Sequence, residues 1–381
     1  MRGPIVHGCR GVKRGLTPPS ARRYTVSMEP APQRRRRLES LTGLRFWAAL
    51  LVAGFHLQAY GILSGEFAPF LRQGLTGVSF FFILSGFVLA WSHPSDDTPR
   101  RFWRRRFARV YPAHLVTWLI AAGRLVYHVG ALPWIVYPSL VLVQAWVPQP
   151  SVYYAVNNVS WSLSCEAFFY AVFPFILPRL TTLPTTPRRA LMVFLVVITV
   201  ALAWACHPVE GFSTSQWLVY ILPLGRLPEF LLGALVAVEM LQGTRAPVRA
   251  PVALVLAVLA YLVAGVVPES FRYASVTLVP YALLIAAVAQ ENLDAEAPRT
   301  SRVMVKLGMW SYAFYLVHVQ LVILPLAQVF HAWWGPLGVL PLPHQLGVAL
   351  AMVGASVVAA WLLHVVVEHP LERRLRGTTG R

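Results

Sequence analysis

The stretch GLTGVSFFFILSGFVLAWS, residues 74–92, contains no charged side chain and is long enough to cross a lipid bilayer as an α-helix. A helix needs roughly 20 apolar residues to span about 30 Å of hydrocarbon. Further apolar runs precede and follow it, at about 44–63, 109–128, 131–147, 159–178, 190–206, 217–241, 250–267, 274–290, 304–328 and 345–366. The sequence therefore predicts an all-α, polytopic integral membrane helical bundle.

The composition of the whole chain agrees with this fold class. Hydrophobic residues make up 57% of the 381 positions and charged residues only 13%, whereas soluble domains carry about 25% charged residues. The net charge of +18 is concentrated, since residues 1–45 hold 11 of the 33 Lys and Arg and residues 100–109 hold 6. Clusters of this kind favour orientation in a lipid bilayer over nucleic-acid binding, so no nucleic-acid partner is expected.

The positions of the basic clusters predict the topology. Short loops rich in Lys and Arg face the cytoplasm, and the clusters at 34–37, 100–109 and the C-terminus all fit that side. The loops at 207–216 and 329–344 contain no Lys or Arg and are expected outside. These assignments give about ten net crossings if the short, proline-bearing segment 131–147 is shallow or re-entrant. We therefore expect a multi-pass protein of the cell (inner) membrane with both termini in the cytoplasm.

One membrane domain flanked by two basic tails is the expected organisation. Residues 1–39 are rich in Arg, Pro and Ser and lack the apolar core of a signal peptide, which predicts a disordered basic tail. Met28 directly precedes EPAPQRRRR and is a candidate start site, which would place residues 1–27 before the true start. The membrane domain is expected over residues 40–370, followed by a basic cytoplasmic tail over residues 371–381.

No bound metal or cofactor is expected from the sequence. Cys9, Cys165 and Cys206 lack the paired spacings of a disulfide framework or a thiolate metal site. No paired-histidine metal motif or glycine-rich phosphate loop is present.

Two ionisable residues inside apolar runs form the first candidate catalytic pair. Glu166 lies within WSLSCEAFFYAVFP, where a charged side chain costs about 2.5–3.5 kcal/mol on insertion scales and needs a partner. His56 follows Arg45 by eleven residues, a helical rise of about 16 Å that places it near the bilayer midplane. A histidine there is a natural proton acceptor, and a carboxylate beside it would stabilise the imidazolium. The alternative is a structural histidine bonded to a backbone carbonyl.

The basic run RRFWRRRFARVYPAHL, residues 100–115, is the next candidate. Arg106 and Arg109 lie three residues apart on one helical face, and guanidinium groups bind phosphate bidentately. The pair predicts an inner-face site for a phosphorylated substrate. The same run also fits a flank that only fixes orientation, or a contact with anionic lipid headgroups.

Other polar positions carry weaker signals. Arg226 and Glu229 are three residues apart on one predicted helix and either bind substrate or neutralise each other. His318 either lines a cavity or is hydrogen-bonded in the core. Ser85 and Gly86 are a small pair that lets two helices approach closely.

Five sequence motifs that contain these residues, in this order, resemble motifs of the acyltransferase 3 family of membrane O-acyltransferases. They are LTGLRFWAALLVAGFH, FFFILSGF, RRFARVYP, WSLSCEAFFYAVFP and WSYAFYLVH. The resemblance runs from about residue 40 to residue 370. Because no soluble domain is attached, the chain is most similar to the single-domain branch that includes macrolide O-acyltransferases.

The resemblance implies transfer of a short acyl group, such as acetyl, to a hydroxyl of a carbohydrate or of a glycosylated or polyketide natural product. Acyl-CoA is the implied donor, as a co-substrate rather than a bound cofactor. His56 and Glu166 are the implied catalytic residues. With the polar positions above, the candidate substrate-binding residues are Arg45, Arg106, Arg109, Trp161, Ser162, Ser164, Arg226 and His318. An arginine, Ser162 or Ser164 would stabilise the oxyanion.

Several alternatives stay open at this point. The acceptor could be the sugar of a cell-surface polysaccharide or glycolipid rather than a macrolide. Cys165, beside Glu166, is a candidate acyl carrier, so direct transfer and a two-step route both fit. A secondary transporter would also place Glu and His at the midplane, although typically with internal repeats and broken helices. A catalytically silent membrane scaffold is the other alternative.

Overall fold

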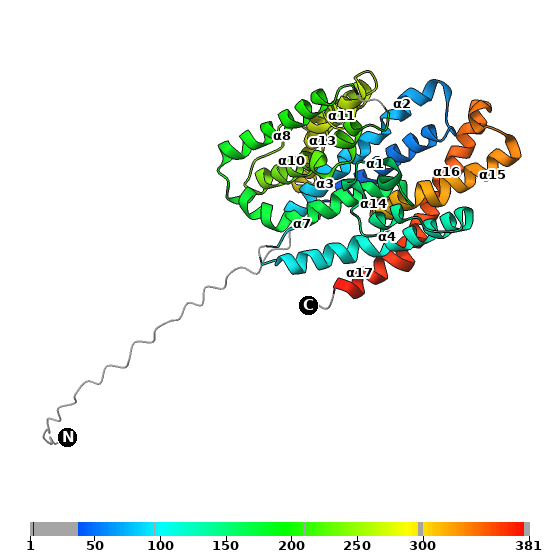
Figure 1. Ribbon diagram of the computed structural model, residues 1–381. Helices are drawn as coiled ribbons and strands as arrows, with labels where there is room; N and C mark the ends of the chain where they lie inside the picture. Colours follow the sequence, from blue (N-terminus) through cyan, green and yellow to red (C-terminus); the bar gives the residue numbers. More distant parts are fainter. Residues whose placement is uncertain (1–2, 4–36, 95, 209–210, 296–299, 377–381) are drawn as a thin grey trace. The chain divides into compact units, whose positions relative to one another are not determined.

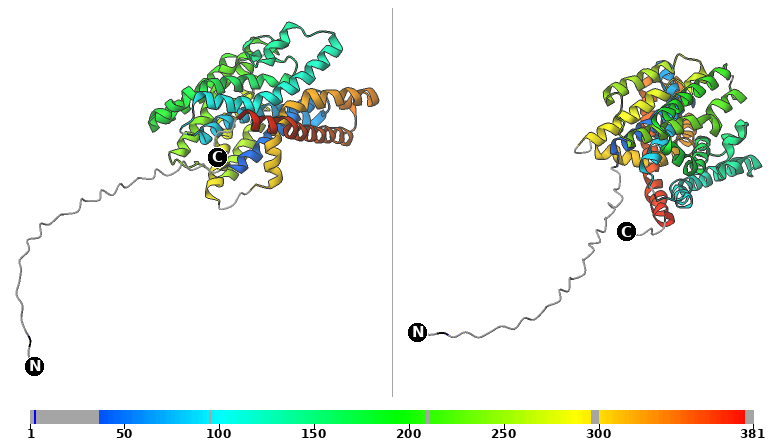
Figure 2. Two further views of the ribbon diagram at one scale, coloured as in Figure 1. Left: turned by 90° about the horizontal axis from the view of Figure 1, so that it is seen from below. Right: turned by 90° about the vertical axis from the view of Figure 1, so that its left-hand side faces the viewer.

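The computed structural model describes residue 3 and residues 37–94, 96–208, 211–295 and 300–376. In this part of the chain the regular structure is entirely helical, as predicted (Figures 1 and 2). Most of the predicted tail over residues 1–39 lies outside the described residues. Helix α1 begins at Glu39, next to the expected start of the membrane domain.

Helices of very different length make up the described unit. The longer ones are α1 (Glu39–Ala59), α3 (Gly77–Ser92), α4 (Pro99–Val129), α7 (Trp161–Thr182), α8 (Thr185–Ala205), α10 (Pro223–Leu241), α11 (Ala250–Val263), α13 (Leu278–Asp294), α14 (Arg302–Val317), α15 (Leu324–Trp334) and α16 (Leu342–Leu363). Short helices α2 (Ala68–Arg72), α6 (Pro150–Tyr153), α9 (Thr214–Gln216) and α12 (Glu269–Arg272) lie in the connections.

Seven helical stretches of the described chain are long and apolar enough to cross a membrane, which makes this a multi-pass membrane protein. They are Glu39–Ala59, Gly65–Ser92, Asn158–Thr182, Thr185–Ala205, Thr214–Leu241, Arg302–Trp334 and Leu342–Arg376. Helices α4, α11 and α13 occupy three further predicted segments, but α11 is a shorter apolar helix and the other two fall outside this group. The figure of about ten crossings therefore stays a prediction.

The predicted segment 131–147 does not form a spanning helix. It consists of the 3-10 turn η3 (Trp134–Val136), the four-residue helix α5 (Tyr137–Leu140) and the 3-10 turn η4 (Gln144–Trp146). Prolines at 133 and 138 interrupt it, because proline lacks the N–H that a continuing helix needs. This agrees with the expectation of a shallow or re-entrant stretch.

The small pair in 74–92 fixes the packing of α3 on α10. A Cβ atom at Gly86 would lie 1.9 Å from the carbonyl oxygen of Phe230, and one at Gly233 would lie 1.8 Å from the carbonyl oxygen of Ile83. The two helix backbones therefore touch at reciprocal glycines, as small residues permit in membrane bundles. Ser85 and Gly86 were predicted to have this role, and Gly86 does.

Three helices widen into π-helical turns that the sequence did not reveal. These turns are η6 (Trp217–Ile221), η7 (His318–Ile323) and η9 (His364–Glu368). Such insertions are rare and often lie at functional sites. Two of the three, η6 and η7, border the cavity described below.

The C-terminal region is helical farther than the predicted domain boundary at residue 370. Helix α17 (His369–Arg376) follows η9 and lies beside α4 (Figure 1). Arg109 of α4 forms ion pairs of 3.0 Å with both Glu368 and Glu372. These pairs order the first residues of the expected tail, and residues 377–381 lie outside the described chain.

Candidate active site

His56 lies in the last turn of α1 and lines a cavity of about 590 Å³. Such a volume is typical of small-molecule sites. The wall is rich in aromatic side chains, contributed by Phe55, Tyr60, Tyr154, Trp161, Phe212, Tyr220, Tyr273 and Tyr315. The histidine is thus nearer the end of its helix than the sequence suggested, because α1 starts at Glu39 and Arg45 is already in its second turn.

The partner of His56 is a second histidine. His318 Nε2 lies 3.2 Å from His56 Nδ1, and the ring centroids are 5.0 Å apart. His318 is fully buried at the first residue of η7, behind His56 as seen from the cavity. The widened turn places its ring against α1.

Neighbouring carbonyl groups assign the protons of both rings. His318 Nδ1 lies 2.8 Å from the carbonyl oxygen of Tyr315 and 3.2 Å from that of Phe314, so this nitrogen carries the proton. His318 Nε2 is then an acceptor, and His56 Nδ1 donates to it and to the carbonyl oxygen of Val52 at 2.9 Å. This assignment follows from the hydrogen-bond network. It leaves the lone pair of His56 Nε2 free.

Residues at the start of α7 complete the surroundings of the histidines. Trp161 lines the cavity. Ser162 is one layer behind, where its hydroxyl lies 2.9 Å from the hydroxyl of Tyr315 and donates to the carbonyl of Val159. On the cavity wall, the amide of Asn158 donates to the Tyr60 hydroxyl at 2.8 Å.

Glu166 is not the partner of His56. No hydrogen bond or ion pair joins the two residues within the described chain. Tyr170, one turn farther along α7, donates a 3.0 Å hydrogen bond to Glu166 Oε2. The charged neighbours of Glu166 are Arg45, Arg106 and Arg109. The carboxylate predicted to orient the base therefore belongs to the arginine cluster instead.

The arginine cluster consists of Arg45, Arg106 and Arg109, three predicted site residues. Two of them have an unpaired nitrogen, and the third is paired with carboxylates. Arg45 and Arg106 each have a buried Nε atom without a hydrogen-bond partner. Arg109 is held by the two carboxylates at the end of the chain. Arg106 also lines a cavity of about 250 Å³ between α4 and α7, together with Tyr170. The two arginines with a guanidinium nitrogen free to bind phosphate are therefore Arg45 and Arg106, whereas the sequence predicted Arg106 and Arg109 for this role.

Two helices connect the arginine cluster with the histidine cavity. On α1, Arg45 and His56 are eleven residues apart, a separation of about 16 Å along the helix axis. On α7, Trp161 lines the cavity and Tyr170 lies in the cluster. One ligand that reaches both places must therefore be elongated.

Three candidate residues line neither of these two cavities, although Arg226 lies directly behind the cavity wall, with its guanidinium carbon 5.3 Å from the ring of Tyr220. Arg226 is fully buried and its Nε lies 3.0 Å from Glu229 Oε2, which favours the mutual-neutralisation interpretation. The Ser164 hydroxyl is buried without a hydrogen-bond partner, and it does not line either cavity. The thiol of Cys165 is buried and donates to the carbonyl of Ile221 at 3.3 Å.

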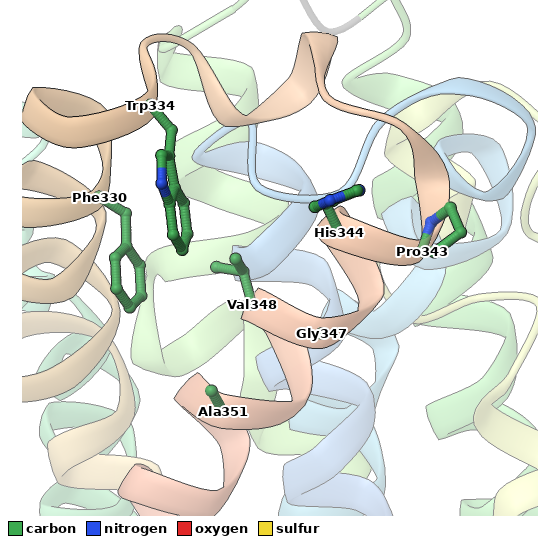
Figure 3. A pocket seen from close by; sticks show the side chains of 7 residues that line it. All are labelled: Phe330, Trp334, Pro343, His344, Gly347, Val348 and Ala351. Atoms are coloured by element: carbon green, nitrogen blue, oxygen red, sulfur yellow. The ribbon is translucent and has the colours of Figure 1, made fainter.

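A third cavity, of about 400 Å³, lies between α15 and α16 (Figure 3). Phe330 and Trp334 line one side, and His344 and Val348 line the other. It contains none of the predicted site residues. Among the described residues, no group of three or more His, Cys, Asp or Glu side chains could hold a metal ion.

Some members of the site were predictable from the sequence and others were not. His56 and His318 were predicted as candidates but not as a pair. Tyr60, Asn158 and Tyr170 were not predicted. Tyr170 had a usable signal, because it follows Glu166 by four residues on the same predicted helix, the spacing at which helical side chains meet. The other two lie at or beyond helix ends, where spacing gives no geometry.

The fold and the site together define a polytopic membrane protein in which a histidine on the wall of a ligand-sized cavity is paired with a buried histidine behind it. The acyltransferase domain family matches residues 38–362. The chain therefore belongs to the acyltransferase 3 family and is an O-acyltransferase. This confirms the predicted enzyme class over the transporter and scaffold alternatives.

The chain is similar to several known proteins over most of its length. It is 38% identical to acyltransferase MdmB of Streptomyces mycarofaciens over 90% of this chain and 94% of that protein. It is 29% identical to the putative membrane-bound transacylase BcsY of Komagataeibacter xylinus over 79% of this chain and 77% of that protein. It is 25% identical to the putative peptidoglycan O-acetyltransferase YrhL of Bacillus subtilis, over 77% of this chain but 50% of that protein. No solved structure matches the chain.

Proposed function

We propose that this O-acyltransferase moves a short acyl group from acyl-CoA to a hydroxyl group, with His56 as the general base. The observation that carries the proposal is the position of His56 in the cavity wall, with Nδ1 hydrogen-bonded to His318 and Val52 and Nε2 left free. A base needs a free lone pair within reach of the proton it removes. His56 Nε2 meets that requirement.

The reaction follows from this arrangement. His56 Nε2 takes the proton of the acceptor hydroxyl, and the oxygen attacks the thioester carbonyl. Collapse of the tetrahedral intermediate expels the CoA thiolate, which takes up the proton from the imidazolium. Tyr60 is placed to stabilise the oxyanion, because its hydroxyl accepts from Asn158 and keeps its own proton to donate.

The donor is assigned to the arginine cluster. Acyl-CoA is elongated, with phosphates at one end and the thioester at the other, as the separation of the two places requires. Arg45 and Arg106 provide buried, unsatisfied guanidinium nitrogens for the phosphates. Glu166 and Tyr170 position these guanidinium groups. The predicted orientation puts this cluster at the cytoplasmic face, where acyl-CoA is found.

A glycosylated or polyketide natural product is the acceptor we favour. The cavity combines aromatic faces with polar groups, which suits a partly apolar molecule that carries sugars. The chain covers nearly the whole length of MdmB from a Streptomyces species but only half of the putative peptidoglycan O-acetyltransferase. A cell-surface polysaccharide or glycolipid sugar is the second candidate.

Comparative mass spectrometry of a deletion strain tests the function. Small-molecule extracts and envelope glycans are compared between the parent strain, the deletion strain, and deletion strains complemented with the wild type or with His56→Ala. We expect one compound or glycan to lose the mass of an acetyl or larger acyl group, and only the wild type to restore it. Restoration by His56→Ala would contradict the assignment of the base.

Arg106→Gln tests the donor site. We expect the KM for acyl-CoA to rise about 10–100-fold with little change in kcat, since a hydrogen bond to a charged group contributes about 1.5–3 kcal/mol. Initial rates with labelled acetyl-CoA in nanodiscs give both constants. Arg101→Gln is the matched control, because Arg101 is an exposed arginine of the same helix. Equal KM values for both variants would exclude Arg106 from donor binding.

A further inference from the structure

Gln216 is a cavity residue that neither the sequence nor the proposed mechanism uses. It lines the same cavity as His56, is 8% exposed, and directly precedes the π-helical turn η6. Hydrogen bonds hold the turn on either side of it. The Gln216 N–H donates to the Ser213 hydroxyl at 3.2 Å, and the Trp217 indole donates to the carbonyl of Ala145 at 2.9 Å. These two bonds anchor the turn that carries the Gln216 side chain.

The hydrogen-bond network determines which way the amide of Gln216 faces. Tyr273 donates its only proton to Glu269 Oε1 at 2.6 Å. Burial and the neighbouring carboxylate raise the pKa of Tyr273, so it keeps that proton. Tyr273 can then only accept from Gln216, and the Nε2 of Gln216 lies 3.3 Å away as the donor.

The amide oxygen at the other side of this group has no partner. Gln216 Oε1 is buried and makes no hydrogen bond in the structure. A buried polar atom left in this state costs about 1–3 kcal/mol. Because Gln216 lines the cavity, a ligand that carries a hydrogen-bond donor would remove this cost.

The wall beside Gln216 indicates the kind of ligand. The rings of Tyr220 and Tyr273 stack with centroids 4.4 Å apart, and Trp161 lies 4.7 Å from Tyr220. All three rings line the cavity that Gln216 and His56 share. Flat aromatic surfaces with hydrogen-bonding groups between them fit a sugar ring, whose C–H faces are apolar and whose edges carry hydroxyls.

We propose that the Gln216 amide oxygen accepts a hydrogen bond from an acceptor hydroxyl other than the one that is acylated. Gln216 is thus a specificity-determining residue, and Tyr273 with Glu269 are its positioning residues. The acceptor class is a polyhydroxylated ring, such as a sugar or the sugar of a glycoside. This inference rests on the proposed acyl transfer and adds the requirement for a second hydroxyl.

Deoxy analogues test the inference directly. The full-length protein in nanodiscs is given labelled acetyl-CoA with methyl β-D-glucopyranoside, each of its monodeoxy analogues, or cyclohexanol as a single-hydroxyl probe. We expect the wild type to lose about 10–100-fold in kcat/KM with one analogue that still carries the acylated hydroxyl. Gln216→Met should lose a similar factor with the parent glycoside and nothing further with that analogue.

Two further variants separate recognition from folding. Tyr273→Phe leaves Gln216 in place but removes the hydroxyl that its amide N–H donates to. The amide oxygen is then no longer held in one orientation, so we expect a higher KM for the glycoside with little change in kcat. Gln328→Met replaces an exposed glutamine and should match the wild type. A folded Gln216→Met protein that still discriminates between the glycoside and its deoxy analogues as the wild type does would overturn the inference. Acylation of cyclohexanol by the wild type as efficiently as the glycoside would also overturn it. Acylation of neither probe by the wild type would overturn the simple sugar ring as acceptor class, whereas the deletion-strain comparison separately tests the proposed acyl transfer.

Discussion

Replacing His56 with alanine is expected to lower the kcat for acyl transfer by about 10²–10⁴-fold, the usual contribution of a general base. The substitution removes the contact with His318 but leaves the apolar packing of α1 in place, since His56 faces a cavity, so the variant should remain folded. Rates with labelled acetyl-CoA in nanodiscs, with size-exclusion profiles for folding, give the measurement. Near-native transfer by a folded His56→Ala protein would show that another group removes the proton.

His318 provides the second half of this prediction. His318→Ala removes the acceptor that fixes the His56 ring, and a loss of about 10-fold in kcat follows from one hydrogen bond of about 1.5 kcal/mol. His318→Gln keeps an acceptor oxygen near the former Nε2 position and should restore part of the activity. An exposed histidine of α4, His128, supplies the control variant His128→Ala. Equal activity of His318→Ala and His318→Gln would argue against the pairing.

The fold class was predictable because it depends on composition and run length alone. Residues 74–92 had to be helical in lipid, since only a helix or a closed barrel satisfies every backbone polar group there. Gly86 marked the close contact with α10 through its size. The π-helical turns were not predictable, because one extra residue in a turn leaves the apolar pattern almost unchanged. That turn at His318 is what brings the second histidine to His56.

The pairing of site residues was harder to predict than their identity. Glu166 and His56 were matched because both are ionisable residues in apolar runs, but run position does not specify which helices touch or at what height. In the structure Glu166 is five residues beyond Trp161, about 7.5 Å farther along α7 from the cavity. Arg109 was mispaired for a different reason. Its partners Glu368 and Glu372 lie at the predicted domain boundary, where no structure was expected.

Arg226→Leu is expected to destabilise the folded protein by about 3–5 kcal/mol, as happens when one member of a buried ion pair is removed. Arg226 is fully buried, 3.0 Å from Glu229, and also donates to the Ser79 hydroxyl at 3.0 Å. Its guanidinium carbon lies 5.4 Å from the ring of Phe82 and 5.3 Å from that of Tyr220. Without Arg226, Glu229 is left in an apolar interior with no opposite charge. The midpoint of thermal unfolding in detergent and the monodisperse fraction give the measurement.

The double variant Arg226→Leu/Glu229→Leu distinguishes a structural pair from a substrate site. Removing both charges also removes the desolvation cost of each, so the double variant should recover most of the stability that Arg226→Leu loses. Its acyl-transfer constants should then resemble those of the wild type, because the pair lines none of the three cavities. A double variant that is stable but has a strongly raised KM for either substrate would return Arg226 to the substrate-binding role predicted from its sequence.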